Sequence, residues 1–355
     1  MRRHAADDAP TRASSARLAK GVQMVSAQAP IHSGFNARST ADDVIAGLDL
    51  SGKTAIVTGG CFGVGLEIAR ALASAGARVV VPTRTPHMAR AALGRVAEGA
   101  EIESLDLMSP SSIDAFAVRF LASGRSLSIL VNSADIMGAP PARDARGNES
   151  HLSANHLGHF QLAVRLWPAL RRASGARVVA VSSGKHQISG VDFDDMNFER
   201  RPYDKWVAYG QSKTANALFA VALDARGEQH GVRSFSLHSG TVVSPFARLL
   251  SPEIATFGVF EDDGNTFVSE KCDLKTVEEG AATAVWCATS PQLDGSGGVY
   301  CENCDIAHMT SAASVAHITH AAPNTGFGVR QWAVDLDLAE RLWRSSENLT
   351  GARLP

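Results

Sequence analysis

From residue 53 onward, short apolar runs alternate with longer segments in which apolar residues recur every three or four positions. The short runs are rich in valine, isoleucine and leucine, which is typical of buried strands, whereas the longer segments have the spacing of amphipathic helices. This alternation predicts right-handed β-α-β units around a parallel sheet. The predicted strands span residues 54–58, 78–81, 102–106, 127–131, 177–182, 234–237 and 299–301.

The same pattern predicts one folded domain with a tail. Residues 1–45 are rich in Ala, Ser, Arg and Asp and lack periodicity, so we expect a flexible, solvated N-terminal tail there. Met24 lies in this segment and is a candidate for the natural start of the protein. No long linker divides the elements that follow, so residues 46–355 are predicted to form a single α/β domain, a doubly wound parallel sheet with helices on both faces.

The composition excludes several classes of protein. The chain has 355 residues, of which 45% are hydrophobic and 20% charged, with a formal net charge of -2. This balance argues against a broad surface for nucleic acid or for an anionic membrane. No run approaches the ~20 apolar residues that span a bilayer, and no apolar segment of a secretory signal follows the first arginines. We therefore expect a cytoplasmic protein without a membrane span, whose partner is a small molecule and not a nucleic acid.

The five cysteines do not predict a metal site. Cys61, Cys272 and Cys287 lack the spacing of metal ligands, so reduced thiols are expected. Cys301 and Cys304 form a C-x-x-C motif, but there is no second such pair, and the motif directly follows a short apolar run. A late strand is therefore preferred over a zinc or redox site.

Tyr209 and Lys213 stand four residues apart in a segment with helical spacing. Positions i and i+4 of a helix lie on one face with Cβ atoms ~5–6 Å apart, so a phenol and an ammonium there can act on one ligand. A cation about 4 Å from a partly shielded phenol is worth roughly 4 kcal/mol, or about three pKa units, which would make the tyrosine a usable general acid. Taken alone, this spacing is also a common accident of amphipathic helices.

Gly59, Gly63 and Gly65 lie between a predicted strand and a predicted helix. Because they lack side chains, they permit a tight turn and let a pyrophosphate approach the helix N-terminus. The alternative interpretation is a turn that only closes the strand onto its helix.

The end of the next predicted strand bears on the choice of nucleotide. An NAD site usually has an acidic residue there for the ribose hydroxyls, whereas this chain has Val81-Pro82-Thr83-Arg84. The guanidinium of Arg84 suits a 2′-phosphate, so NADP(H) is favoured over NAD(H), the alternative being a solvated arginine. Asp106 follows the third predicted strand. It is a candidate to accept a hydrogen bond from the adenine amino group, and the alternative is that it caps the next helix beside Ser109.

Five motifs, in this order, resemble the short-chain dehydrogenases/reductases. They are Thr58-Gly-x-x-x-Gly63-x-Gly65, Leu105-Asp106-Leu107, Asn155-His-Leu-Gly-His-Phe160, Val181-Ser-Ser183 and Tyr209-x-x-x-Lys213. The run from Asn155 and the insertion before Tyr209 are most similar to the retinol dehydrogenase and WW-domain oxidoreductase branch. The resemblance implies a Rossmann-type sheet and an oxidoreductase that moves a hydride between NADP(H) and a secondary alcohol, ketone or aldehyde.

The resemblance also implies roles for individual residues. Tyr209 would be the general acid/base, and Lys213 would lower its pKa and hold the nicotinamide ribose. Ser183 would hydrogen-bond the substrate oxygen, and Asn155 would hold a water in a proton relay. The implied cofactor-binding residues are Gly59, Cys61, Phe62, Gly63, Val64, Gly65, Arg84, Asp106, Leu107, Asn132, Ser133, Ala134, Tyr209, Lys213, Ser239, Gly240, Val242 and Ser244.

Three positions depart from the family pattern. Asp135 follows Asn132-Ser-Ala where the family usually has glycine, so its side chain must either point away from the nucleotide or crowd it, and a positive φ would be strained. Ser239-Gly240 replaces the usual Pro-Gly, and Ser244 replaces a common threonine whose hydroxyl it retains. These changes keep open the alternative of a nucleotide-binding relative with little catalysis, acting as a sensor or a scaffold.

The substrate pocket is expected in the segment of about residues 245–275. Phe257, Phe260 and Phe267 indicate an apolar lid over a small apolar carbonyl or alcohol substrate, or aromatic side chains that only fix the loop. Relatives commonly form homo-oligomers, so the resemblance allows one here.

Overall fold

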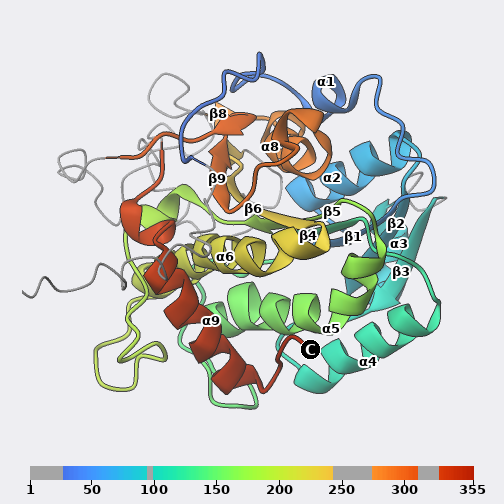
Figure 1. Ribbon diagram of the computed structural model, residues 1–355. Coiled ribbons are helices and arrows are strands. Elements are labelled where there is room, and N and C mark those ends of the chain that lie inside the picture. The colour runs from blue at the N-terminus through green and yellow to red at the C-terminus, as the bar shows by residue number, and fades with distance from the viewer. Residues whose placement is uncertain (1–26, 94–98, 243–273, 311–327) are drawn as a thin grey trace, which may run out of the picture.

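The computed structural model describes residues 27–93, 99–242, 274–310 and 328–355. An eight-stranded sheet forms its centre, with the strand order β10-β9-β6-β5-β4-β1-β2-β3 (Figure 1). All neighbouring strands are parallel except β9 and β10. The strands are β1 (Thr54–Thr58), β2 (Arg78–Thr83), β3 (Ala100–Ser104), β4 (Ile129–Asn132), β5 (Ala176–Val181), β6 (Val232–His238), β9 (Val299–Glu302) and β10 (Asp305–Ile306), and a separate short pair joins β7 (Thr241–Val242) to β8 (Leu274–Lys275).

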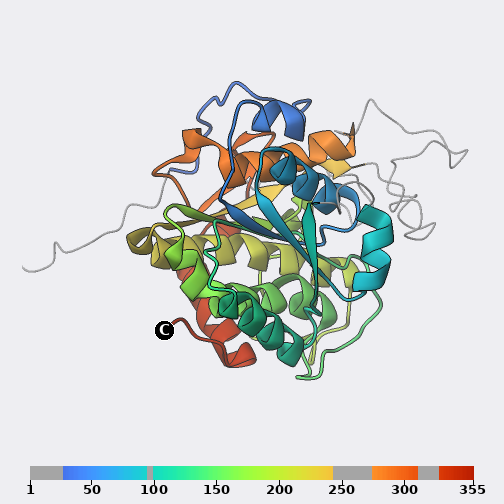
Figure 2. The ribbon, with the colours of Figure 1, turned by 90° about the vertical axis from the view of Figure 1, so that its right-hand side faces the viewer.

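Helices cover both faces of the sheet (Figure 1, Figure 2). One face carries α1 (Ala41–Ile45), α2 (Gly63–Ser74), α3 (Pro86–Leu93) and α8 (Val277–Thr289), and the other carries α4 (Pro110–Ala122), α5 (Gly158–Arg172), α6 (Lys205–Gly227) and α9 (Leu336–Thr350). Short helical turns are η2 (Leu152–Leu157), η3 (Gly184–Gln187), η4 (Glu228–His230), η5 (Pro291–Leu293) and η7 (Gln331–Ala333).

The two hydrophobic cores follow from strand geometry. Successive side chains of a strand point to opposite faces, so Ile56 packs with the α4, α5 and α6 side while Val57 packs with the α2 and α8 side. All five residues of β1 are buried, which explains why its three central residues are apolar in succession and do not alternate with polar ones. The predicted doubly wound α/β fold is confirmed, and so is each of the seven predicted strands.

The antiparallel edge strand β10 was not predicted. It follows β9 through a tight turn in which Asn303 and Cys304 have φ of 51° and 59°. A cysteine is unusual in the left-handed region, so the turn carries no Asn-Gly signal that would indicate a hairpin. Cys301 lies within β9, which confirms the strand interpretation of the C-x-x-C motif, and both of its cysteines are buried free thiols.

The predicted boundary of the N-terminal tail is corrected by the structure. Within residues 27–45, α1 begins with a capping box at Thr40 and buries Ala41, Val44 and Ile45 against the core that contains α8. The Gln28 side chain donates to the carbonyl oxygens of Tyr300 and Ala307 at 2.9 and 2.6 Å. These residues belong to the folded domain because they contact α8 and the end of the sheet at Tyr300 and Ala307, which are long-range contacts that local composition does not reveal.

Several predictions fall on residues that the structure does not describe. Met24, Cys272 and Ser244 lie outside the described residues, and so does almost all of the expected substrate loop with Phe257, Phe260 and Phe267. Within the described ranges, no helix has both the length and the apolar composition needed to cross a membrane.

Candidate active site

A cavity of about 730 Å³ opens at the carboxyl ends of β1, β2 and β4. The chain leaves β1 toward α2 on one face of the sheet and leaves β4 toward α5 on the other, and such a switch point is where doubly wound sheets bind ligands. The cavity collects eleven of the predicted cofactor residues. They are Gly59, Cys61, Phe62, Gly63, Val64, Gly65, Arg84, Asp106, Leu107, Ser133 and Ala134.

The glycines of the first turn are required by close packing. A Cβ atom on Gly65 would stand 2.4 Å from the carbonyl oxygen of Gly59, and a Cβ atom on Gly59 would stand 2.9 Å from the backbone of Ala134. The 12-residue helix α2 starts here without a side-chain cap and without an acidic residue in its first turn. Its N-terminal N–H groups and positive dipole end are therefore suited to an anion.

Thr58 and His159 hold this turn against the end of β4. The Nδ1 of His159 lies 2.9 Å from the carbonyl oxygen of Asn155 and must carry the proton, so Nε2 accepts from the Thr58 hydroxyl at 2.9 Å. The same hydroxyl oxygen accepts from the backbone N–H groups of Ser133 and Ala134 at 2.9 and 3.1 Å. One buried side chain thus fixes the floor of the cavity.

Arg84 and Asp106 lie at the far end of the cavity. Arg84 is exposed and follows the last residue of β2, where no carboxylate stands. Asp106 accepts from the backbone N–H of Met108 at 2.9 Å, and Ser109 is the N-cap of α4, so the N-cap alternative for Asp106 is wrong. Its second carboxylate oxygen has further capacity to accept a hydrogen bond.

The helix α6 carries Tyr209 and Lys213 on one face. Asp204 caps this helix by accepting from the backbone N–H groups of Trp206 and Val207, and Tyr209 and Lys213 are 4% and 1% exposed. The Lys213 ammonium lies 5.3 Å from the centre of the Tyr209 ring and donates to the carbonyl oxygen of Val181 at 3.2 Å. The structure therefore brings together the pair that the i, i+4 spacing predicts.

Asp135 points at this pair. Its Oδ2 lies 2.9 Å from Nζ of Lys213 and accepts from the Tyr209 hydroxyl at 3.2 Å. The side chain of Lys213 is 2% exposed and that of Asp135 is 36% exposed, so a buried cation meets a partly solvated carboxylate. Asp135 is not among the described residues with positive φ, so the anticipated backbone strain is absent. It also lines the cavity.

The electrostatics of Tyr209 differ from the prediction. Burial raises the pKa of the Tyr209 phenol well above its usual range, the Asp135 carboxylate raises it further, and a hydrogen bond with Ser183 acts in the opposite direction. The expectation that Lys213 leaves Tyr209 with a lowered pKa is therefore wrong for this structure. The physical reason is first the burial of the phenol, which disfavours the phenolate, and then the Asp135 carboxylate beside it.

Asn155 lies in the π-helical turn η2 and is fully buried. Its Oδ1 accepts from the backbone N–H of Ile136 at 2.8 Å, and its Nδ2 donates to the carbonyl oxygen of Ile136 at 3.0 Å and to Ser212 at 2.9 Å. Both amide hydrogens are thus used to tie the segment after Asp135 to α6. Asn155 acts here as a positioning residue for that segment.

Ser183 and the Ser239-Gly240 turn flank the tyrosine side of the site. Ser183 caps η3 by accepting from the backbone N–H of Lys185 at 3.2 Å, while its hydroxyl also contacts Tyr209. Gly240 has φ of 85°, and a Cβ atom there would stand 2.6 Å from the Lys275 side chain. Ser239, Gly240, Val242, Tyr209 and Lys213 do not line the 730 Å³ cavity, and neither does Asn132, which lies under it in β4.

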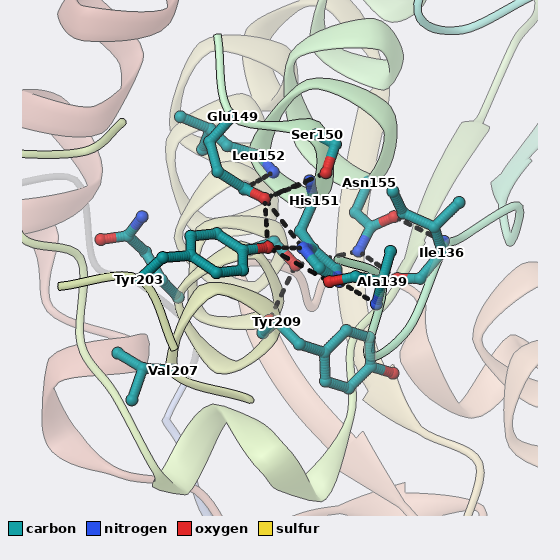
Figure 3. A network of polar contacts seen from close by, with 12 residues as sticks. Ile136, Ala139, Glu149, Ser150, His151, Leu152, Asn155, Tyr203, Val207 and Tyr209 are labelled. Atoms are coloured by element: carbon teal, nitrogen blue, oxygen red, sulfur yellow. Dashed lines mark hydrogen bonds and ion pairs between the residues drawn. The ribbon is translucent and has the colours of Figure 1, made fainter. Parts of the chain in front are cut away.

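Sequence reasoning missed a buried network beside Tyr209, shown in Figure 3. Glu149 lies 2.8 Å from Nδ1 of His151, the Tyr203 hydroxyl donates to Glu149 at 3.1 Å, and Nε2 of His151 lies 3.2 Å from the backbone N of Ala139. The His151 ring meets the Tyr209 ring edge to face at 6.1 Å. No spacing motif indicates these residues, because the contacts cross two loops and the start of η2.

The residues present fit a dinucleotide. The glycine turn leaves room that side chains would fill, and the N-terminus of α2 has no side-chain cap. The buried side-chain polar atoms of Asn132, Ser239 and Thr241 have no hydrogen-bond partner in the described structure, although such groups are almost always satisfied. Asn132 underlies the cavity and the other two follow β6, so a bound molecule or its waters can supply the missing partners.

Comparisons with known proteins identify the family of the chain. Residues 53–254 match the family model described as short chain dehydrogenase. The chain is 41% identical to "Probable oxidoreductase" of Streptomyces antibioticus, covering 83% of this chain and 97% of that protein, and 35% identical to retinol dehydrogenase 12 of Homo sapiens, covering 86% and 89%. It is 36% identical to the WW domain-containing oxidoreductase of Gallus gallus, covering 81% and 70%.

Solved structures share the fold. A crystal structure of an uncharacterised protein from Mycobacterium paratuberculosis has a TM-score of 0.65 and 28% identity, covering 89% of this chain and 98% of that one. A Pseudomonas aeruginosa RhlG/NADP active-site complex has a TM-score of 0.54 and 23% identity, covering 71% and 94%, and this second likeness concerns the fold alone.

Proposed function

The chain belongs to the short-chain dehydrogenase family as an oxidoreductase of the retinol dehydrogenase and WW-domain oxidoreductase branch, and we propose that it uses NADP(H) to interconvert small apolar carbonyl compounds and alcohols, with Tyr209 as general acid/base. The family uses NAD(P) cofactors. One observation carries the proposal. Tyr209, Lys213 and Ser183 lie close together, and next to them is a cavity lined by the glycine turn and by the N-terminus of α2, which has no side-chain cap.

The proposed roles follow from the contacts. When bound, NADP(H) supplies or accepts the hydride. The Ser183 hydroxyl, which already contacts Tyr209, donates a hydrogen bond to the substrate oxygen and holds it near the phenol. Tyr209 gives its proton to that oxygen during reduction and takes it back during oxidation. The Lys213 ammonium has three N–H donors, so its contacts with Asp135 and Val181 leave one for the ribose of the cofactor.

The preference for NADP(H) rests on Arg84. It is exposed at the cavity, directly after β2, and no carboxylate there repels a 2′-phosphate. A guanidinium binds a phosphate with two parallel hydrogen bonds, which a ribose hydroxyl cannot match.

A second candidate function is nucleotide binding with little catalysis. The observation that favours it is the contact of Asp135 with both Lys213 and Tyr209, which engages the two side chains that a cofactor and a substrate would need. A sensor or scaffold of this kind would bind NADPH without turning over a carbonyl compound.

A binding and turnover experiment separates the two functions. NADPH is titrated by its fluorescence, and its absorbance loss is then followed with a panel of apolar aldehydes and ketones. We expect turnover by the wild type and a kcat lower by roughly 10²- to 10⁴-fold in Tyr209→Phe, because general acid catalysis contributes about that much. An unchanged Kd for NADPH in the variant serves as its folding control. Binding without turnover above the rate of the variant would establish the second candidate instead.

A further inference from the structure

We propose that Asp135 is a fifth member of the proton-transfer site and returns a proton to Tyr209 after the tyrosine has protonated a carbonyl oxygen. The inference rests on the proposed function, because it concerns the proton that carbonyl reduction removes from Tyr209. It starts from geometry, since one oxygen of Asp135 contacts both the Tyr209 hydroxyl, at 3.2 Å, and the Lys213 ammonium, at 2.9 Å.

The side chain of Asn155, the residue to which the family resemblance assigns a relay water, is engaged elsewhere. Both of its amide hydrogens bond to Ile136 and Ser212, so the side chain has no hydrogen left to donate to a water. Tyr209 and Lys213 are almost completely buried, so neither exchanges protons with bulk water directly. Asp135 is the group in contact with both that also reaches solvent, with 36% of its side chain exposed.

Three titratable groups surround Asp135. Lys213 and Tyr209 face it from α6, and His159 of α5 lies close enough for its pKa to respond to the carboxylate. The pKa of His159 is lowered to about 4, by burial first, so this imidazole is neutral near pH 7 and does not compete for the proton. The ammonium of Lys213 keeps the site close to electroneutral when Tyr209 becomes a phenolate.

Each proton can be followed through the step. As the carbonyl is reduced, the O–H bond of Tyr209 breaks and a new O–H bond forms on the substrate oxygen. The Asp135 carboxylate then takes a proton from the solvent at its exposed side and passes it to the phenolate, so that Tyr209 is a phenol again and Asp135 is a carboxylate again. Asp135 and Lys213 end in the states in which they began, and no further oxidant or reductant is needed.

The arrangement suits reduction better than oxidation. Burial and the Asp135 carboxylate both raise the pKa of Tyr209, so the phenol keeps its proton at neutral pH and is ready to act as an acid. Alcohol oxidation needs the phenolate, which this environment disfavours. A site of this kind therefore needs a group that returns a proton to Tyr209 after each turnover.

Asp135→Asn tests the proposal, since it keeps the shape of the side chain and removes the carboxylate that takes up and passes on the proton. We expect kcat for carbonyl reduction to fall at least about tenfold, with a larger solvent deuterium isotope effect and an unchanged Kd for NADPH. Asp135→Glu should recover part of the loss. Asp294→Asn is the matched control, because Asp294 also pairs with a buried cation, Arg177 at 2.7 Å, but lies away from the site, and its kcat should equal that of the wild type.

A second measurement needs no turnover. The chain has three tyrosines, so the ultraviolet absorbance of the phenolate can be titrated, with Tyr209→Phe as the baseline that isolates Tyr209. Removing the neighbouring anion in Asp135→Asn should move the ionisation of Tyr209 to lower pH.

The outcomes distinguish the proposal from the function on which it rests. A wild type that reduces carbonyl compounds, together with an Asp135→Asn variant of equal or higher kcat, overturns the relay. An unshifted phenolate titration in that variant overturns the contact itself. If the wild type is inactive and Asp135→Gly is active, Asp135 is a block and not a donor, and the relay is overturned. If no variant turns over a carbonyl compound but the phenolate titration of Tyr209 still shifts in Asp135→Asn, the proposed function fails and the contact of Asp135 with Tyr209 stands.

Discussion

Arg84 is the single residue on which the choice of cofactor depends in our proposal. It stands alone at the end of β2, exposed and beside the cavity, so its contribution to nucleotide binding can be measured without disturbing the core. Charged hydrogen bonds of this kind contribute about 1.5–3 kcal/mol.

Arg84→Ala should therefore weaken NADPH binding by roughly 10- to 100-fold and leave NADH binding almost unchanged, because only NADPH carries the 2′-phosphate. The measurement is the Kd of each nucleotide by fluorescence. Arg90→Ala is the control, since Arg90 is exposed on α3 and does not line the cavity. Equal losses for the two nucleotides would contradict the role assigned to Arg84.

Individual site residues were predictable to different degrees. Tyr209 and Lys213 could be placed together because four residues of helix fix their relative position. The contact of Asp135 with Tyr209 could not be predicted, since 74 residues separate them and the contact depends on how the segment after β4 folds against α6. Sequence reasoning identified Asp135 as a departure from the family pattern, but only the structure shows that it contacts Tyr209 and Lys213 and that, after burial, it contributes to the raised pKa of Tyr209.

At the scale of elements, the turn from β1 into α2 combines two functions. It brings the strand and the helix into close contact through Gly59 and Gly65, and it leaves the helix N-terminus open to the cavity. This element was predictable, because the glycine spacing and the buried run before it are both local. The hairpin of β9 and β10 was not, because its turn uses Cys304 in a left-handed conformation.

Gly65→Ala should destabilise the protein by about 1–3 kcal/mol, since the added Cβ would stand 2.4 Å from the carbonyl oxygen of Gly59 and the helix must shift. Urea unfolding measures the loss as a lower midpoint. The matched variant is Gly99→Ala, where no atom lies within 4 Å of the added Cβ, and its midpoint should stay near that of the wild type. A stable Gly65→Ala protein with full nucleotide affinity would show that close packing at this turn is not required.

At the scale of the whole molecule, three buried histidines link stability to pH. Burial is the main cause that lowers the pKa of His156 to about 3 and those of His159 and His186 to about 4, and all three are 2% exposed or less. In the unfolded chain a histidine has a pKa near 6.5. The unfolded state therefore binds protons first as the pH falls, and the stability that these groups contribute is fully present only above about pH 6.5.

We accordingly expect the free energy of unfolding to fall as the pH decreases from 6.5 toward 4, by up to about 1.4 kcal/mol per histidine and pH unit. Thermal unfolding between pH 7.5 and 5 checks this as a falling Tm. His156→Gln should reduce the slope, because it removes one titrating group whose Nε2 lies 2.7 Å from the Ser346 hydroxyl. A Tm that stays constant over this range would contradict the assignment of neutral, buried imidazoles.

The contact between Gln28 and Tyr300 can form only late in the synthesis of this protein. The two residues are 272 positions apart, and their hydrogen bonds form only when both have been made. At translation rates of about 5–20 residues per second, roughly 15–55 s pass between the appearance of the first partner and that of the second. The central strands have all emerged by then, so the segment around Gln28 makes this contact only after those strands are available for pairing.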